Sequence, residues 1–194
     1  MDIERRIFTS QVELRMVGDS NMAVGYGAVF NSMSEDLGGF REIIAPGAFD
    51  SVMNDDVRGL INHDPNLILG RTKSGTMRIS VDATGLRYEI DMPSTSYAND
   101  IRESLSRGDI TQSSFAFSID GDDWAVSESG ETIRTIKKVS KLYDVSVVTY
   151  PAYPEAQAGI KRMMEFSATR QSCVNAEHEL IERELELIGL LSDE

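Results

Sequence analysis

TMRISVDATGLRYEIDM, residues 76–92, places two short runs of β-branched and aromatic residues on either side of the turn signal DATG at 82–85. Apolar and polar residues partly alternate within each run, which is typical of strands with one buried face. The stretch therefore predicts two neighbouring strands of a β-sheet.

The same pattern extends outward from this stretch, from residue 6 to about residue 150. Ten short strands with few helical breaks predict a mainly β chain with peripheral helices, arranged as a barrel or sandwich. Helices are expected only at 46–53 and 97–108. Besides 76–82 and 85–92, the expected strands are 6–16, 22–30, 40–44, 57–63, 110–119, 124–129, 132–140 and 143–150.

The character of the chain changes after the Pro-Ala-Tyr-Pro corner at 151–154. From about residue 155 proline is absent, and Val174, Ile181 and Leu185 fall on one helical face. Residues 177–194 hold seven acidic residues and one arginine, a net charge of −6. The chain is therefore expected to divide into a β domain, 1–154, and an acidic helical tail, 155–194. The tail is either an ordinary helix docked on its own core or a detachable, partner-binding element.

Composition limits the classes of function. The chain has 194 residues, 41% of them hydrophobic, and a formal net charge of −13, which predicts a folded protein that does not bind nucleic acid, because such binding depends on lysine and arginine. A single cysteine, Cys173, excludes an internal disulfide framework. No apolar run has the length of a membrane span or of a secretory signal, so we expect a cytoplasmic protein without a membrane partner.

Histidine is scarce, and one of the two histidines lies where a reactive group is useful. His63 follows the apolar strand 57–62 and should lie at a strand end, whereas His178 lies among the acids of the tail. A lone histidine is more often structural than catalytic. Asp64 beside it does not complete a metal site, since no other histidine is near. We therefore expect neither a metal nor a cofactor.

Two strands carry the remaining candidates. Ser113 and Ser114 are adjacent in ITQSSFAFSI, 110–119, so their side chains point to opposite faces. Asp144 interrupts the apolar strand 143–150. Its carboxylate either faces solvent or is buried, and a buried carboxylate needs a partner such as a histidine ring or backbone N–H groups. The acidic segment IDGDDW, 119–124, is interpreted as a hairpin turn, since it lacks the longer loop and distal glutamate of a calcium site.

These segments together resemble the prohead proteases of tailed bacteriophages, which share a fold with herpesvirus assemblin. The likeness runs from GYGAVFN at 25–31 to PAYPEA at 151–156, about two thirds of the chain, with four motifs in order. These motifs are REIIAPGAFDSVM (41–53), LINHDPNLILGRT (60–72), LSRGDITQSSFAFSI (105–119) and YDVSVVTYPAYPEA (143–156). The resemblance implies an assemblin-like closed β-barrel, to which the amphipathic tail helix is added.

The resemblance also implies the catalytic residues. The essential histidine of the family corresponds to His63, its serine to Ser114 before Phe-Ala-Phe, and its acid to Asp144; Ser113 is an adjacent alternative nucleophile. The implied function is a serine endopeptidase of capsid maturation. Its substrates would be the major capsid protein precursor, the scaffold segment of that precursor and the protease itself, inside the prohead in the bacterial cytoplasm. A homo-oligomer is left open. The alternative is a non-catalytic assembly protein that binds coat subunits.

Overall fold

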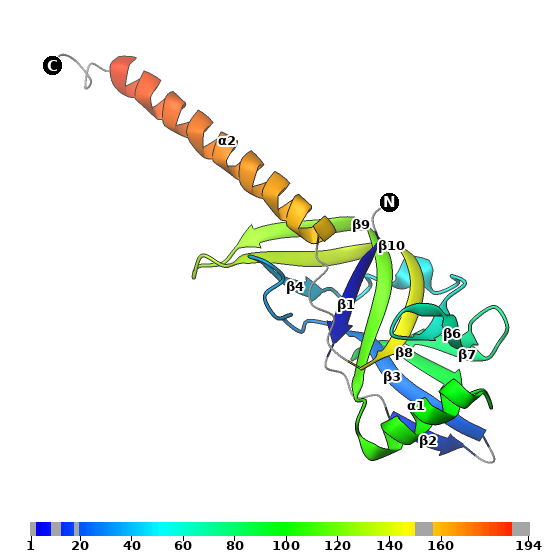
Figure 1. Ribbon diagram of the computed structural model, residues 1–194. Helices are drawn as coiled ribbons and strands as arrows, with labels where there is room; N and C mark the ends of the chain where they lie inside the picture. Colours follow the sequence, from blue (N-terminus) through cyan, green and yellow to red (C-terminus); the bar gives the residue numbers. More distant parts are fainter. Residues whose placement is uncertain (1–2, 9–12, 18–19, 150–156, 188–194) are drawn as a thin grey trace.

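The computed structural model describes residues 3–8, 13–17, 20–149 and 157–187. In these residues the chain is mainly β, with two α-helices and one short 3-10 helix (Figure 1), which confirms the expected class. The helices are η1 (Asp50–Val52), α1 (Ser96–Arg107) and α2 (Gln157–Leu187). The strands are β1 (Glu4–Phe8), β2 (Glu13–Val17), β3 (Ser20–Val29), β4 (Arg41–Ile44), β5 (Arg58–Ile61), β6 (Asp64–Arg71), β7 (Met77–Val81), β8 (Gly85–Asp91), β9 (Gln112–Val126) and β10 (Thr132–Val148).

The described strands form two sheets. One has the order β1-β9-β10-β5-β6, with β4 also pairing with β10, and the other has the order β2-β3-β8-β7. Strand β10 lies antiparallel to β9 and parallel to β5. At the same level, Ser146 of β10 pairs with Ser114 of β9 on one side and with Leu60 of β5 on the other. Side chains from three strands can therefore meet at this end of β10.

The hairpin expected at 76–92 is confirmed as the antiparallel pair β7–β8. The Asp82 carboxylate accepts hydrogen bonds from the backbone N–H groups of Thr84 and Gly85, at 2.7 and 3.1 Å. A Cβ added at Gly85 would lie 2.0 Å from the backbone oxygen of Ala28. Glycine is thus required here by the close approach of β3.

The interpretation of residues 119–124 as a hairpin turn is wrong. They lie inside the long strand β9, which pairs with β10 as far as Val126. Their carboxylates are held by basic side chains of β10: Lys138 donates to Asp120 at 2.6 Å, and Arg134 donates to Asp122 at 2.8 Å. Opposite charges on neighbouring strands stabilise the pairing, so aspartates that are typical of turns remain in a strand.

The core face of β9 carries the aromatic centre of the protein. Phe115 and Phe117 are fully buried and stack with their ring centroids 4.4 Å apart. Phe49, just before η1, meets Phe115 edge-on at 5.7 Å. Strand alternation then directs Ser114 and Ala116 to the opposite face.

The three helices agree with the sequence to different degrees. The helix expected at 97–108 is confirmed as α1, which ends at Gly108 with a left-handed φ of 78°. The one expected at 46–53 is reduced to the single turn of η1. The tail helix is confirmed as α2, whereas the expected domain boundary at 154/155 lies outside the described residues.

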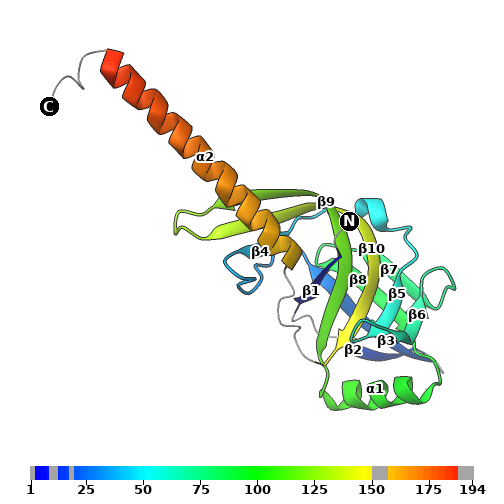
Figure 2. The ribbon, with the colours of Figure 1, turned by 45° about the horizontal axis from the view of Figure 1, so that its top comes forward.

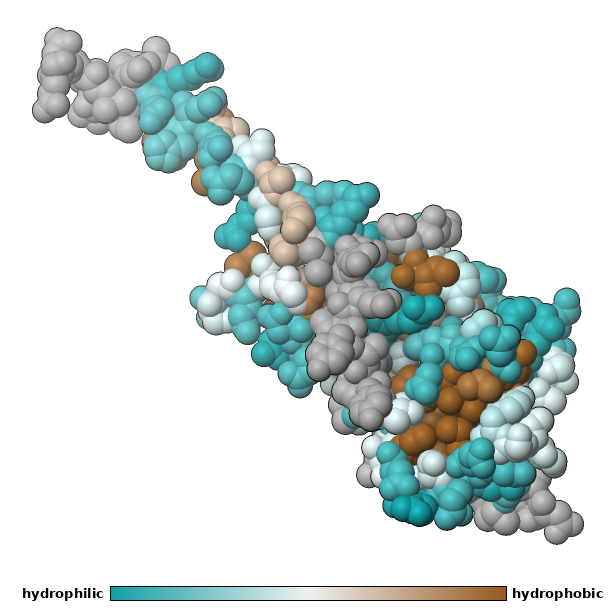
Figure 3. Space-filling model, in the orientation of Figure 1, coloured by the Kyte–Doolittle hydropathy of each residue, from teal (hydrophilic) through white to brown (hydrophobic). Residues whose placement is uncertain are grey.

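Helix α2 projects away from the sheets, and its first turns lie against the β9–β10 hairpin (Figures 1 and 2). Phe166 stacks on Trp124 at 5.9 Å, and Arg162 pairs with Asp122 at 3.2 Å. From residue 167 to residue 184 every described side chain is exposed. Along this part, hydrophobic side chains lie between hydrophilic ones (Figure 3).

Candidate active site

His63 lies in a two-residue turn between β5 and β6. Ile61 pairs with Asp64, and both turn residues, Asn62 and His63, have positive φ angles of 51° and 58°. Such angles belong to a type I′ hairpin turn. The backbone N–H of Thr149 donates to the Asn62 side-chain oxygen at 2.9 Å, which ties the turn to the end of β10. The strained conformation is thus held in place by a neighbouring strand.

Asp144 meets His63 from the adjacent strand β10. Its Oδ1 lies 2.6 Å from His63 Nδ1, and the two side chains are 10% and 9% exposed. The Ser146 hydroxyl donates to the same oxygen at 2.8 Å, and the backbone N–H of His63 donates to Ser146 Oγ at 3.2 Å. Ser146 thus connects the carboxylate to the histidine turn. Ser146 is not among the residues expected from the sequence. Its only signal there is its position two residues after Asp144, on the same strand face.

Ser114 completes the arrangement from β9. Its Oγ lies 2.6 Å from His63 Nε2, and the side chain is fully buried. Because Nδ1 faces a carboxylate, the ring carries its proton there, which leaves the Nε2 lone pair to accept the Ser114 hydroxyl proton. A second acceptor, the Arg6 backbone oxygen of β1, lies 2.9 Å from the same Oγ. This backbone contact was not expected from the sequence.

Ser113 points away from these residues. Its Oγ is 2.6 Å from the hydroxyl of Tyr88, on the core face of β9. Burial raises the pKa of Tyr88, so its phenol stays neutral and shares one hydrogen bond with Ser113. Ser113 therefore belongs to the core face of β9, opposite to the face on which Ser114 meets His63.

A buried cluster of four charged residues joins β1 to β4 and β10 and is called here the buried ion cluster. It consists of Glu4 and Arg6 of β1, Glu42 of β4 and Arg134 of β10, whose side chains are all at most 4% exposed. Arg6 donates to both oxygens of Glu42, at 2.8 and 3.0 Å. Arg134 donates to both oxygens of Glu4, at 2.7 and 2.9 Å, and to Glu42 at 2.9 Å. Two cations thus face two anions within the cluster, and Arg134 also donates to Asp122 at 2.8 Å.

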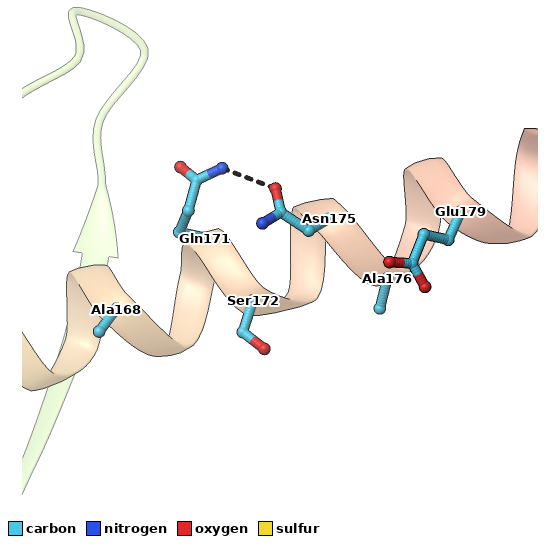
Figure 4. A pocket seen from close by; sticks show the side chains of 6 residues that line it. All are labelled: Ala168, Gln171, Ser172, Asn175, Ala176 and Glu179. Carbon is cyan, nitrogen blue, oxygen red and sulfur yellow. Dashed lines mark hydrogen bonds between the residues drawn. The ribbon is translucent and has the colours of Figure 1, made fainter.

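The remaining polar candidates lie elsewhere. His178 is on the exposed part of α2, 3.4 Å from Glu182, and Cys173 is exposed on the same helix. A hollow beside α2 is lined from that helix alone, and within it Gln171 donates to Asn175 at 2.9 Å (Figure 4). These residues share no contact with His63.

Neither a metal site nor a membrane span is found in the part of the chain that the structure describes. Within those ranges, no group of three or more histidine, cysteine or acidic side chains could hold a metal ion. No helix there is both long and apolar enough to cross a bilayer.

A serine, a histidine and an aspartate joined by two 2.6 Å hydrogen bonds form the arrangement found in serine hydrolases of several folds. The comparisons with known proteins agree with that class. The family model of the Caudovirus prohead serine protease matches residues 10–171, and the chain belongs to this family. It is a serine endopeptidase of phage capsid maturation.

No curated protein matches the chain. A similar solved structure is that of the bacteriophage T4 capsid assembly protease, gp21, at 12% sequence identity and a TM-score of 0.46. The match covers 77% of this chain and 98% of that chain.

Proposed function

We propose that Ser114, His63 and Asp144 are the catalytic triad of this prohead protease. The observation that carries the proposal is the continuous hydrogen-bonded chain from Asp144 through His63 to Ser114. The three residues come from β10, the β5–β6 turn and β9, so the packing of the sheet holds their spacing. The contact of Ser113 with Tyr88 supports Ser114 as the nucleophile.

In the proposed reaction, Ser114 Oγ attacks the scissile carbonyl carbon while His63 Nε2 takes the hydroxyl proton. The C–N bond then breaks, and Nε2 returns that proton to the leaving amine, which leaves an acyl-enzyme. Water attacks the acyl group by the same proton transfers and releases Ser114. Asp144 holds the Nδ1–H tautomer and stabilises the imidazolium, and Ser146 orients the Asp144 carboxylate through its 2.8 Å hydrogen bond.

We infer that the substrates are the capsid protein precursor and its scaffold segment, with the protease itself as a further substrate, inside the prohead in the host cytoplasm. Family membership supports this substrate class. We also infer that the two sheets close into one barrel. This is supported by contacts of β3 with β1 and β9, and of β6 with β7 and β8.

The tail, 155–194, is proposed to deliver or regulate the protease. In support, the side chains from residue 167 to residue 184 are exposed, whereas Phe166 stacks on Trp124. Among the described side chains of α2, the large exposed apolar ones are Met164, Val174, Leu180 and Ile181. Val174 and Ile181 lie seven residues apart on one side of the exposed part of α2, an arrangement suited to contact with another protein.

The test is cleavage of the coat precursor by purified variants. Ser114→Ala and His63→Ala should abolish cleavage, and the matched controls Ser113→Ala and His178→Ala should retain it. Loss in all four variants would point to misfolding, which circular dichroism detects. Cleavage by folded Ser114→Ala at the wild-type rate would overturn the triad. If the wild-type protein binds the precursor without ever cleaving it, the non-catalytic assembly role is favoured instead.

A further inference from the structure

Strand β1 lies directly along the residues that surround Ser114. It pairs with β9 in antiparallel register, with Ile7 opposite Ser114 and Arg5 opposite Ala116. The Arg6 backbone oxygen is 2.9 Å from Ser114 Oγ. A main-chain carbonyl of the protein's own N-terminal strand is thus within hydrogen-bond distance of the proposed nucleophile.

An extended substrate that binds by adding a strand to β9 needs the place beside β9 that β1 occupies. The other side of β9 is occupied at the same level by β10, through the pair Ser114 and Ser146. Strand β1 is the outermost described strand of its hydrogen-bonded sheet, and besides β9 it contacts β3 of the other sheet. An added strand that takes its place would replace its pairing with β9 and would give up its contacts with β3. Proteins commonly bind extended peptides at such sheet edges.

The contact also affects the chemistry of Ser114. A serine hydroxyl has one proton, and Oγ faces two acceptors, His63 Nε2 at 2.6 Å and the Arg6 oxygen at 2.9 Å. When the proton is donated to Arg6, the hydroxyl is not aligned for transfer to the imidazole. The carbonyl oxygen of Arg6 lies next to Oγ, whereas attack requires the carbonyl carbon there. The strand therefore occupies the site in a form that is not cleaved.

The buried ion cluster holds β1 in this position. Two of its four members, Glu4 and Arg6, belong to β1, and their partners Glu42 and Arg134 belong to β4 and β10. Loss of one partner from a buried ion pair leaves an uncompensated charge, so these contacts resist release. A strand of only five residues is thus anchored by charges that are remote from the reacting atoms.

We propose that β1 is the resident occupant of the substrate-strand position on the edge of β9, and that a substrate must displace it before Ser114 can attack. This inference rests on the proposed function of Ser114. It identifies the β9 edge as the substrate-binding surface and an extended polypeptide strand as its ligand. Release of β1 increases cleavage, and fixing β1 prevents it.

The first test fixes the strand by a reversible bond. Positions 5 and 116 are directly opposed on the face that carries Ser114, within reach of a disulfide. The full-length chain with Arg5→Cys and Ala116→Cys, in a Cys173→Ser background, is assayed oxidised and reduced on the coat precursor, with each single cysteine variant as control. We expect the oxidised form to lose cleavage by about tenfold or more, in proportion to the lost open fraction, and reduction to restore it. Equal cleavage by both forms would overturn the inference.

The second test acts in the opposite direction and away from the triad. Glu42→Gln removes the charge that holds Arg6, and Glu89→Gln is the matched control, since Glu89 pairs with Arg78 and Arg87 on the other sheet. Hydrogen exchange of residues 3–8 and the rate of Ser114 labelling by a fluorophosphonate should both rise in Glu42→Gln and stay unchanged in the control. Faster exchange without faster labelling would contradict the inference. If the wild-type chain neither cleaves nor labels when reduced and folded, the proposed function of Ser114 itself fails.

Discussion

Substitution of the two adjacent serines of β9 should separate a structural role from a catalytic one. Ser113→Ala removes the oxygen that lies 2.6 Å from the Tyr88 hydroxyl. Tyr88 is 1% exposed, so its hydroxyl would be left buried without that partner. We expect Ser113→Ala to reduce stability and to leave the catalytic rate unchanged. Ser114→Ala should abolish cleavage and leave the stability of the fold nearly unchanged.

The size of the stability loss follows from the burial of that hydroxyl. An unpaired buried polar group costs about 1–3 kcal/mol. For a protein of this size, each kcal/mol lowers the melting temperature by about 2–4 °C. Urea unfolding measures the loss, and cleavage of the coat precursor measures the rate on the same samples.

A double-mutant cycle tests the assignment of that loss. Tyr88→Phe removes the other hydroxyl, so Ser113→Ala with Tyr88→Phe leaves no unpaired group and should be less destabilised than the two single changes added together. Additive losses would show that the two hydroxyls are not coupled. A folded Ser113→Ala protein that has lost cleavage, beside a Ser114→Ala protein that retains it, would refute the reasoning and make Ser113 the nucleophile.

Three further predictions concern the charged groups. Asp144→Asn should lower kcat by about 10⁴-fold, because the amide favours the wrong tautomer of His63, and steady-state kinetics measures the change. Arg134→Gln should destabilise the fold by about 3–5 kcal/mol, since it leaves buried carboxylates without their cation, whereas the exposed control Arg78→Gln should cost about 1 kcal/mol or less in urea unfolding. Burial raises the pKa of Glu4, but the hydrogen bond from Arg134 and the nearby positive charges outweigh it, so the folded pKa lies below the usual 4.5. As pH falls, the unfolded chain therefore protonates Glu4 before the folded chain does. The stability that Glu4 contributes is complete above about pH 4.5 and is lost as pH falls through the folded pKa. Hydrogen exchange of residues 3–8, measured over an acid titration, should show release of β1 as pH falls below about 4.5.

The sequence was most informative where periodicity and turn residues agree. The alternation in 76–92 and the helical spacing in 97–108 lead to β7, β8 and α1, because local preference and burial favour the same structure. It failed at 119–124, where aspartate and glycine suggest a turn. The basic residues of β10 that hold those aspartates in a strand lie too far along the chain to be paired by inspection.

The site was predictable in its residue types and much less so in its geometry. The alternation of β9 indicates that Ser113 and Ser114 point to opposite faces, but the partner of each face depends on distant strands. The positive φ of His63 could not be predicted, because no glycine stands in the turn to indicate it. A neighbouring asparagine and contacts with β10 hold this conformation instead. Ser146 reaches Asp144 only because of the register of β10, which the sequence does not show. Arg6 contacts Ser114 through its backbone oxygen, and since every residue has one, the residue type gives no signal.

The most direct test of the account is to locate the site of covalent labelling. The wild-type chain is treated with a fluorophosphonate, digested and analysed by mass spectrometry, beside His63→Ala as the variant without its base. We predict one adduct, on Ser114, that is lost or strongly reduced in His63→Ala. An adduct on Ser113, or a chain that cleaves the coat precursor while Ser114 stays unlabelled, would contradict it.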